Sequence, residues 1–74
     1  MTRKEVESAT RWNIEHKKGI YYNGKRYCGI SFTDEDFTIH AGHPNTMITF
    51  NYAEVEKIEN VRTENGRELT IFIK

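Results

Sequence analysis

The sequence contains little cysteine, little proline and no long apolar run. Among its 74 residues there is one cysteine, Cys28, and one proline, Pro44. A single cysteine excludes a disulfide within the chain, and this scarcity favours a reducing cytoplasm over secretion. No apolar run reaches the length of a membrane span or forms the apolar stretch of a signal peptide. We therefore expect a cytoplasmic protein that does not engage a membrane.

Signatures of catalysis and of cofactor binding are also missing. The chain has no nucleophile elbow, no phosphate-binding loop and no dinucleotide fingerprint. His40 and His43 have the spacing H-x-x-H, but a zinc site needs three or four ligands and no clear further set exists. The acidic run at residues 34–36 lacks the alternating ligands and the central glycine of a calcium loop. We expect no enzymatic activity, no cofactor and no metal site.

The apolar content is low, at 36%. A chain of this size hides only about 60–65% of the surface that its unfolded form exposes. We therefore expect one small domain, residues 1–74, in which a thin core lies on one face of a sheet. Another protein or a second copy of the chain would cover the apolar surface that remains.

Three short segments align as neighbouring antiparallel strands. Turns at 33–36 and 42–45 place large apolar side chains opposite one another in two rows, Phe32/Phe37/Phe50 and Ile30/Ile39/Ile48. The other face carries small polar side chains, Ser31/Thr38/Thr49. A shift of one residue would send every side chain to the wrong face, so the register is strongly specified. Cys28 continues the face of Ile30 and Phe32, and we expect it to be buried.

The first residues predict a helix. Thr2 and Glu5 have the spacing of a capping box, so the helix should begin at about residue 3. The run Lys17-Lys18-Gly19 has the composition of a helix end. The pattern of residues 11–18 fits a helix or a strand, because Trp12 and Ile14 also alternate with polar residues.

Two further hairpins and one helical turn complete the predicted fold. Asn23-Gly24 indicates a type I′ turn between a strand at 20–22 and a second strand that runs directly into the meander. A short helical turn is expected near residues 52–57. The closing hairpin should turn at 64–66 with Gly66 as a bulge, which places Leu69 opposite Val61.

The last strand should direct Leu69, Ile71 and Ile73 to the core and Phe72 to the opposite side. The predicted class is α+β, an N-terminal helix followed by an antiparallel β-meander of five to six strands.

A family resemblance covers residues 29–73. The run Gly29–His40, GISFTDEDFTIH, resembles the strand-turn-strand of GRAM and bacterial pleckstrin-homology-like domains. The segments Ile48–Val55 and Leu69–Ile73 are similar to the turn and the closing hairpin that follow in those domains. The long capping helix of that superfamily has no counterpart in this pattern, so no lipid or peptide site is carried over from the family.

Cations and aromatic residues alternate before and within the first hairpin. We define the basic–aromatic segment by seven residues: Trp12, Lys17, Lys18, Tyr21, Tyr22, Lys25 and Arg26. Residues 1–29 hold seven Lys/Arg against three Asp/Glu, whereas residues 30–74 hold four against eight. This composition suits a protein interface, where Trp, Tyr and Arg contribute most, and it also suits nucleic acid. These side chains could also simply pack at the edge of the sheet.

The sequence therefore predicts a non-catalytic protein-binding module. Its partner would be another protein or a second copy of the chain, and Tyr21 and Arg26 would point away from the core. An accessory or inhibitory protein of a mobile element fits this size and this lack of catalytic chemistry. The alternative is a nucleic-acid-binding module that uses the same basic–aromatic segment.

Overall fold

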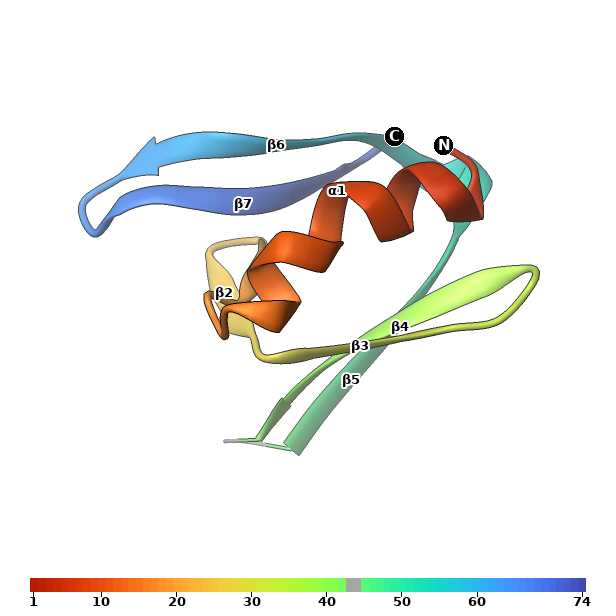
Figure 1. Cartoon of the computed structure of the whole chain (residues 1–74), viewed down its shortest axis with the longest axis horizontal. Coiled ribbons are helices and arrows are strands. Elements are labelled where there is room, and N and C mark those ends of the chain that lie inside the picture. Colours follow the sequence, from red (N-terminus) through yellow and green to blue (C-terminus); the bar gives the residue numbers. More distant parts are fainter. Residues whose placement is uncertain (43–44) are drawn as a thin grey trace.

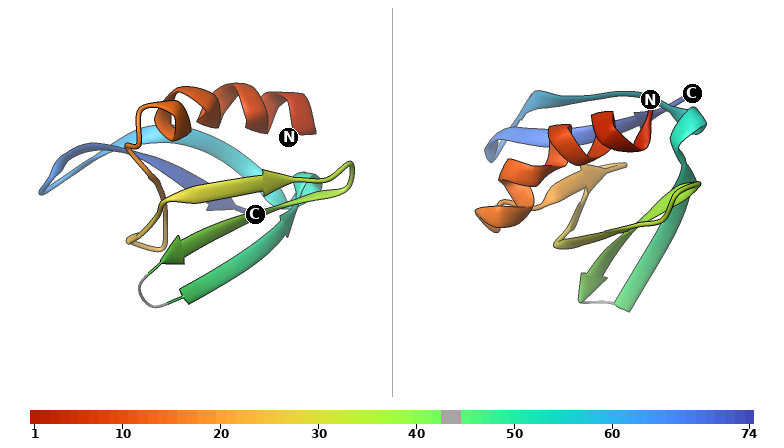
Figure 2. Two further views of the ribbon diagram at one scale, coloured as in Figure 1. Left: turned by 60° about the horizontal axis from the view of Figure 1, so that its bottom comes forward. Right: turned by 45° about the vertical axis from the view of Figure 1, so that its right-hand side comes forward.

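The computed structural model describes residues 1–42 and 45–74, which form an α+β fold of one α-helix and two sheets (Figure 1). The elements are α1 (Arg3–Glu15), β1 (Ile20–Tyr22), β2 (Lys25–Tyr27), β3 (Gly29–Phe32), β4 (Asp36–Gly42), β5 (Asn45–Asn51), the 3₁₀ turn η1 (Tyr52–Glu54), β6 (Val55–Thr63) and β7 (Gly66–Ile73). One sheet has the strand order β2-β1-β7-β6 and the other the order β3-β4-β5. The helix packs against strands of both sheets, in contact with β1 and β6 of one and β3 of the other (Figures 1 and 2).

The three-stranded sheet has the predicted register. Ile39 lies opposite both Ile30 and Ile48, and Phe37 lies opposite both Phe32 and Phe50. On the other face, the hydroxyls of Thr38 and Thr49 lie 2.7 Å apart and share a hydrogen bond. The apolar rows and the polar face are thus confirmed. Of the predicted turn at 42–45, residues 43–44 lie outside the described residues.

The helix begins with the predicted capping box. The Glu5 amide donates to the Thr2 hydroxyl, and the Thr2 amide donates to the Glu5 carboxylate. The helix continues to Glu15, so residues 11–15 are helical. Lys17, at φ 55°, adopts the left-handed conformation after the helix, and Gly19 follows at φ 79°. The buried face of the helix is narrow and consists of Val6 and Thr10.

The prediction of one continuous meander is wrong. Instead, β1 pairs with the final strand β7 in parallel, with Tyr21 opposite Thr70. This pairing separates the first and last hairpins from the β3–β5 meander and makes a second sheet. The Asn23-Gly24 turn is confirmed, since both residues have positive φ, 54° and 77°.

Cys28 is exposed, and the expectation that it is buried is wrong. The chain passes from one sheet to the other at this residue, between β2 and β3. Tyr27 is buried before the change of sheet, while Ile30 and Phe32 face the core after it. Before the change of sheet an odd-numbered side chain faces the core, and after it even-numbered side chains do. Cys28 lies at the change itself, so its side chain does not face the core.

The closing hairpin also differs from the prediction. Thr63 pairs with Gly66, so Leu69 lies opposite Asn60 rather than Val61. The register shift lies at the other end of the strand, between Val55 and Lys57. The helical turn ends at Glu54 rather than near residue 57, and the strand β6 begins directly after it at Val55. The prediction that Leu69 and Ile71 face the core is confirmed, since both are buried.

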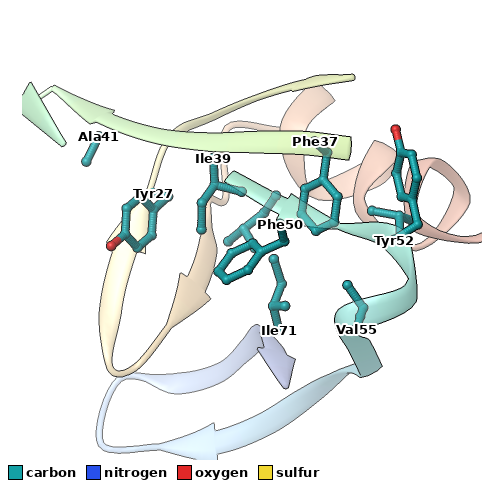
Figure 3. Close-up of a cluster of buried hydrophobic side chains, with 10 residues drawn as sticks. Tyr27, Phe37, Ile39, Ala41, Phe50, Tyr52, Val55 and Ile71 are labelled. Carbon is teal, nitrogen blue, oxygen red and sulfur yellow. The ribbon is translucent and has the colours of Figure 1, made fainter. Parts of the chain in front are cut away.

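The core lies between the two sheets. Figure 3 shows the side chains of Phe37, Ile39 and Phe50 from one sheet directed toward Ile71 from the other. Both chain ends lie at η1, because the N-terminal amine donates to the carbonyl of Tyr52 and the Lys74 amide donates to that of Glu54. Within the described residues, the helix is too short and too polar to cross a membrane.

Candidate partner-binding surface

The end of the helix is joined to the first hairpin by polar contacts. Arg26 Nη2 donates to the carbonyl oxygen of Lys17 at 3.0 Å, and Asn13 Nδ2 donates to that of Gly19 at 3.1 Å. Gly19 has a positive φ, which favours glycine, and a Cβ atom there would lie 2.6 Å from Arg26 Nε, so a larger residue would displace the Arg26 side chain. These contacts hold the cations of the 17–18 segment beside β1 and β2.

Trp12 is the most exposed aromatic side chain among the described residues, with 56% of its surface accessible. Its ring stacks on His16, with the ring centroids 4.1 Å apart and an interplanar angle of 17°. His16 Nδ1 also lies 2.8 Å from the Trp12 carbonyl oxygen and donates to it, because a carbonyl only accepts. The exposed indole is therefore held in one orientation without being covered.

A groove of about 430 Å³ brings part of the basic–aromatic segment together with the last hairpin. Trp12 and Lys18 come from the end of the helix, and Tyr21 comes from β1. Arg67 and Glu68 come from β7, about fifty residues later in the sequence. The sequence analysis did not identify these two residues, because their proximity to Tyr21 depends on the parallel β1–β7 pairing.

A second groove, of about 550 Å³, runs along the outer face of the four-stranded sheet. Val61 and Phe72 are among its apolar lining residues, and it shares Tyr21 and Glu68 with the first groove. Phe72 lies on the side opposite the buried Ile71, as predicted. Side chains alternate along β7, so Thr70 and Glu68 lie on the same face as Phe72. This pattern is visible in the sequence and could have placed Glu68 on this face.

Tyr21 and Glu68 form the polar centre of the surface. Burial, and then the negative charge of the neighbouring Glu68 carboxylate and a hydrogen bond to it, raise the pKa of Tyr21. The Tyr21 phenol thus already interacts with this carboxylate, whereas the oxygen Glu68 Oε1 is shielded from solvent and has no hydrogen-bond donor among the described residues. A buried acceptor without a donor is costly, so this oxygen is suited to accept a hydrogen bond from a bound molecule.

The structure divides the basic–aromatic segment between two faces. Tyr21 and Arg26 lie opposite each other on the outer side, away from the buried Ile20 and Tyr27. Tyr22 lies on the inner side, where its ring meets that of Phe50 edge-on at 4.9 Å.

Lys25 also lies on the inner side. Its Nζ donates to the Thr46 hydroxyl at 3.0 Å and lies 5.6 Å from the centroid of the Tyr27 ring. The structure thus places Trp12, Lys17, Lys18, Tyr21 and Arg26 along the outer surface and Tyr22 and Lys25 within the fold.

Within residues 1–42 and 45–74, no three His, Cys, Asp or Glu side chains are grouped so as to hold a metal ion. His40 of the H-x-x-H pair lies against Gly29, and its partner His43 lies outside the described residues. Comparisons of the chain with protein-family models, with curated proteins and with solved structures find no match.

Proposed function

We propose that this chain is a non-catalytic protein-binding module. Its contact surface would be the groove formed by Trp12, Lys18, Tyr21, Arg67 and Glu68. The observation that carries the proposal is that an exposed, oriented tryptophan shares this groove with a tyrosine and an arginine. These three residue types dominate the binding energy of protein interfaces. Trp and Tyr supply large contact area with few torsional degrees of freedom, and Arg supplies several hydrogen-bond donors.

The polar centre of the groove supports a partner that donates hydrogen bonds. Glu68 Oε1 has no donor among the described residues. A backbone amide, an arginine or a lysine of the partner would supply it, while the apolar Val61 and Phe72 beside it would exclude water.

The same carboxylate argues against nucleic acid as the main ligand. The cations Lys17, Lys18 and Arg26 would attract phosphates, but Glu68 between Tyr21 and Arg67 would repel them. The formal net charge of the chain is zero, so no strong overall field would draw a polyanion. A small accessory or inhibitory protein of a mobile element is a biological setting that agrees with binding without catalysis.

Co-purification from the native host tests the proposal. The tagged wild-type chain and the variant Trp12→Ala/Lys18→Ala are compared, with Lys4→Ala as a control that removes a cation from the same helix outside the groove. We expect a protein that is enriched with the wild type and with Lys4→Ala. Its recovery with the double variant should fall at least about tenfold, the equivalent of about 1.4 kcal/mol of binding energy.

Binding to random-sequence DNA and RNA is measured in parallel as salt is raised. Tight binding whose affinity falls steeply with salt would favour the nucleic-acid alternative. Equal recovery of partner proteins by the wild type and by the double variant would contradict the proposed surface.

A further inference from the structure

The edge strand β5 is unprotected compared with the other strand edges of the described fold. The edge strand β2 has three residues and carries Lys25 and Arg26. The edge strand β6 carries four charged residues, Glu56, Lys57, Glu59 and Arg62. The edge strand β3 lies beside α1, since Ile30 and Phe32 line one small cavity with residues of the helix. Charges, shortness and a covering helix are the usual means of preventing strands from pairing between molecules.

The strand β5 is neither short nor charged, and the nearby cation Lys25 of β2 donates to its Thr46 hydroxyl on the inner face. Its seven residues, NTMITFN, include no charge and no proline, and exposed residues alternate with half-buried or buried ones along it. Met47, at the middle of the exposed face, is 68% accessible. Among the described residues, β5 pairs with β4 alone.

The backbone groups at the centre of this edge are directed outward. The Cys28 amide donates to the His40 carbonyl at 3.0 Å, so His40 directs its backbone polar groups toward β3. A strand residue directs its backbone N–H and C=O to one side only, so those of His40 do not reach β5. Met47, the residue opposite His40 on β5, therefore directs its own N–H and C=O away from β4. Thr49, two residues on, does the same. Two N–H and two C=O groups are thus available for a further strand.

We propose that β5 pairs with β5 of a second copy of this chain, antiparallel and about a two-fold axis at Ile48. The occupant is inferred from the backbone register, because a two-fold axis at Ile48 sets the outward groups of Met47 opposite those of Thr49 in the other copy. In this register Asn45 lies opposite the Asn51 of the other copy, Thr46 lies opposite Phe50, and Ile48 lies opposite Ile48. No like charges meet, and the two three-stranded sheets become one continuous sheet of six strands.

The pairing also covers apolar surface that one chain leaves partly open. Ile48 is half-buried and packs on the rim of the core. Around the two-fold axis, the two Ile48 side chains lie on the same face and cover each other. The pairing is distinct from the groove around Tyr21, so a dimer would present two copies of the proposed binding surface.

Light scattering after size exclusion tests the proposal on the full chain. The measured mass should rise from 8.7 kDa toward twice that value as concentration increases from about 1 µM to about 1 mM, the range expected for a small interface. Two variants, Met47→Lys/Thr49→Lys and Met47→Glu/Thr49→Glu, should each remain monomeric, because each places like charges opposite each other across the axis. An equimolar mixture of the two should form the dimer again, because each lysine then faces a glutamate.

Circular dichroism of each variant confirms that it is folded, and both changed side chains are exposed. A wild-type chain that stays monomeric at about 1 mM would overturn the proposal. A dimer that persists in both charged variants, or a mixture that fails to associate, would overturn it as well. A monomer whose β5 amide signals shift only when a different protein is added would assign the edge to that protein instead.

Discussion

The hydroxyl of Tyr52 donates a 2.6 Å hydrogen bond to the carbonyl oxygen of Thr33. This contact joins η1 to the turn between β3 and β4 and spans nineteen residues of sequence. The Tyr52 ring also packs on Phe37, with centroids 5.6 Å apart. One side chain thus connects the passage between the sheets to the centre of the core.

Replacing Tyr52 with phenylalanine should remove the hydrogen bond and keep the ring contact. We expect Tyr52→Phe to lower the free energy of unfolding by about 0.5–1.5 kcal/mol, as measured by urea denaturation. A stability equal to that of the wild type would show that the hydroxyl contributes nothing to the passage between the sheets.

The same residue makes stability depend on alkaline pH. Burial raises the pKa of Tyr52, so the folded chain holds the phenolic proton more tightly than the unfolded chain does. The stability that the protonated Tyr52 phenol contributes is fully present below the pKa of tyrosine in the unfolded chain, about 10. It is lost as pH rises through the higher pKa of Tyr52 in the folded chain. Denaturant melts above pH ~10 should therefore show a shallower decline for Tyr52→Phe than for the wild type. Identical slopes would contradict this assignment.

Ile39 tests the register of the three-stranded sheet. It is fully buried between Ile30 and Ile48, so Ile39→Ala should cost about 2–5 kcal/mol through lost burial and the cavity left behind. Ile48→Ala, at a half-buried position in the same row, should cost less. A loss below about 1 kcal/mol for Ile39→Ala in denaturant melts would be incompatible with its place in the core.

The meander was predictable from sequence because its pairing is local. Because the turns are short, β4 can pair with its two neighbours in only a few registers. One of these registers sets Phe37 and Ile39 opposite apolar residues on both neighbouring strands. The capping box at Thr2 and the Asn23-Gly24 turn were predictable for the same reason, since each depends on four adjacent residues.

The remaining parts of the fold depend on contacts between distant segments. The parallel pairing of Tyr21 with Thr70 leaves no local pattern, so neither the second sheet nor the groove with Glu68 could be read from the chain. In the closing hairpin, the two-residue turn puts Ile58 opposite Ile71, and the register shift between Val55 and Lys57 puts Val55 opposite Ile73, so apolar residues meet at both places. A bulge at Gly66 satisfies the sequence pattern equally well, and tertiary packing selects between the two solutions.

Cys28 tests the passage between the two sheets. Because its side chain is exposed, a thiol reagent should modify the folded chain at a rate close to that of the unfolded chain. The thiol lies 3.5 Å from the His40 carbonyl, a weak contact that should slow the reaction little. Strong protection of the thiol in the folded state would place Cys28 in the core and contradict the change of sheet at this residue.

The central claim is that the outer surface around Tyr21 serves binding rather than folding, and the double variant Tyr21→Ala/Arg26→Ala tests it most directly. Both side chains lie on the outer face, opposite each other across the Asn23-Gly24 turn. The hydrogen bond from Arg26 to the Lys17 carbonyl oxygen is exposed, so its loss should cost only about 0.5 kcal/mol of stability. Binding of the co-purified partner is measured by calorimetry, together with the melting temperature of the variant. We predict a melting temperature within about 5 °C of the wild type and binding weaker by about 2 kcal/mol or more. Global unfolding of the variant, or unchanged binding by a folded variant, would contradict the claim.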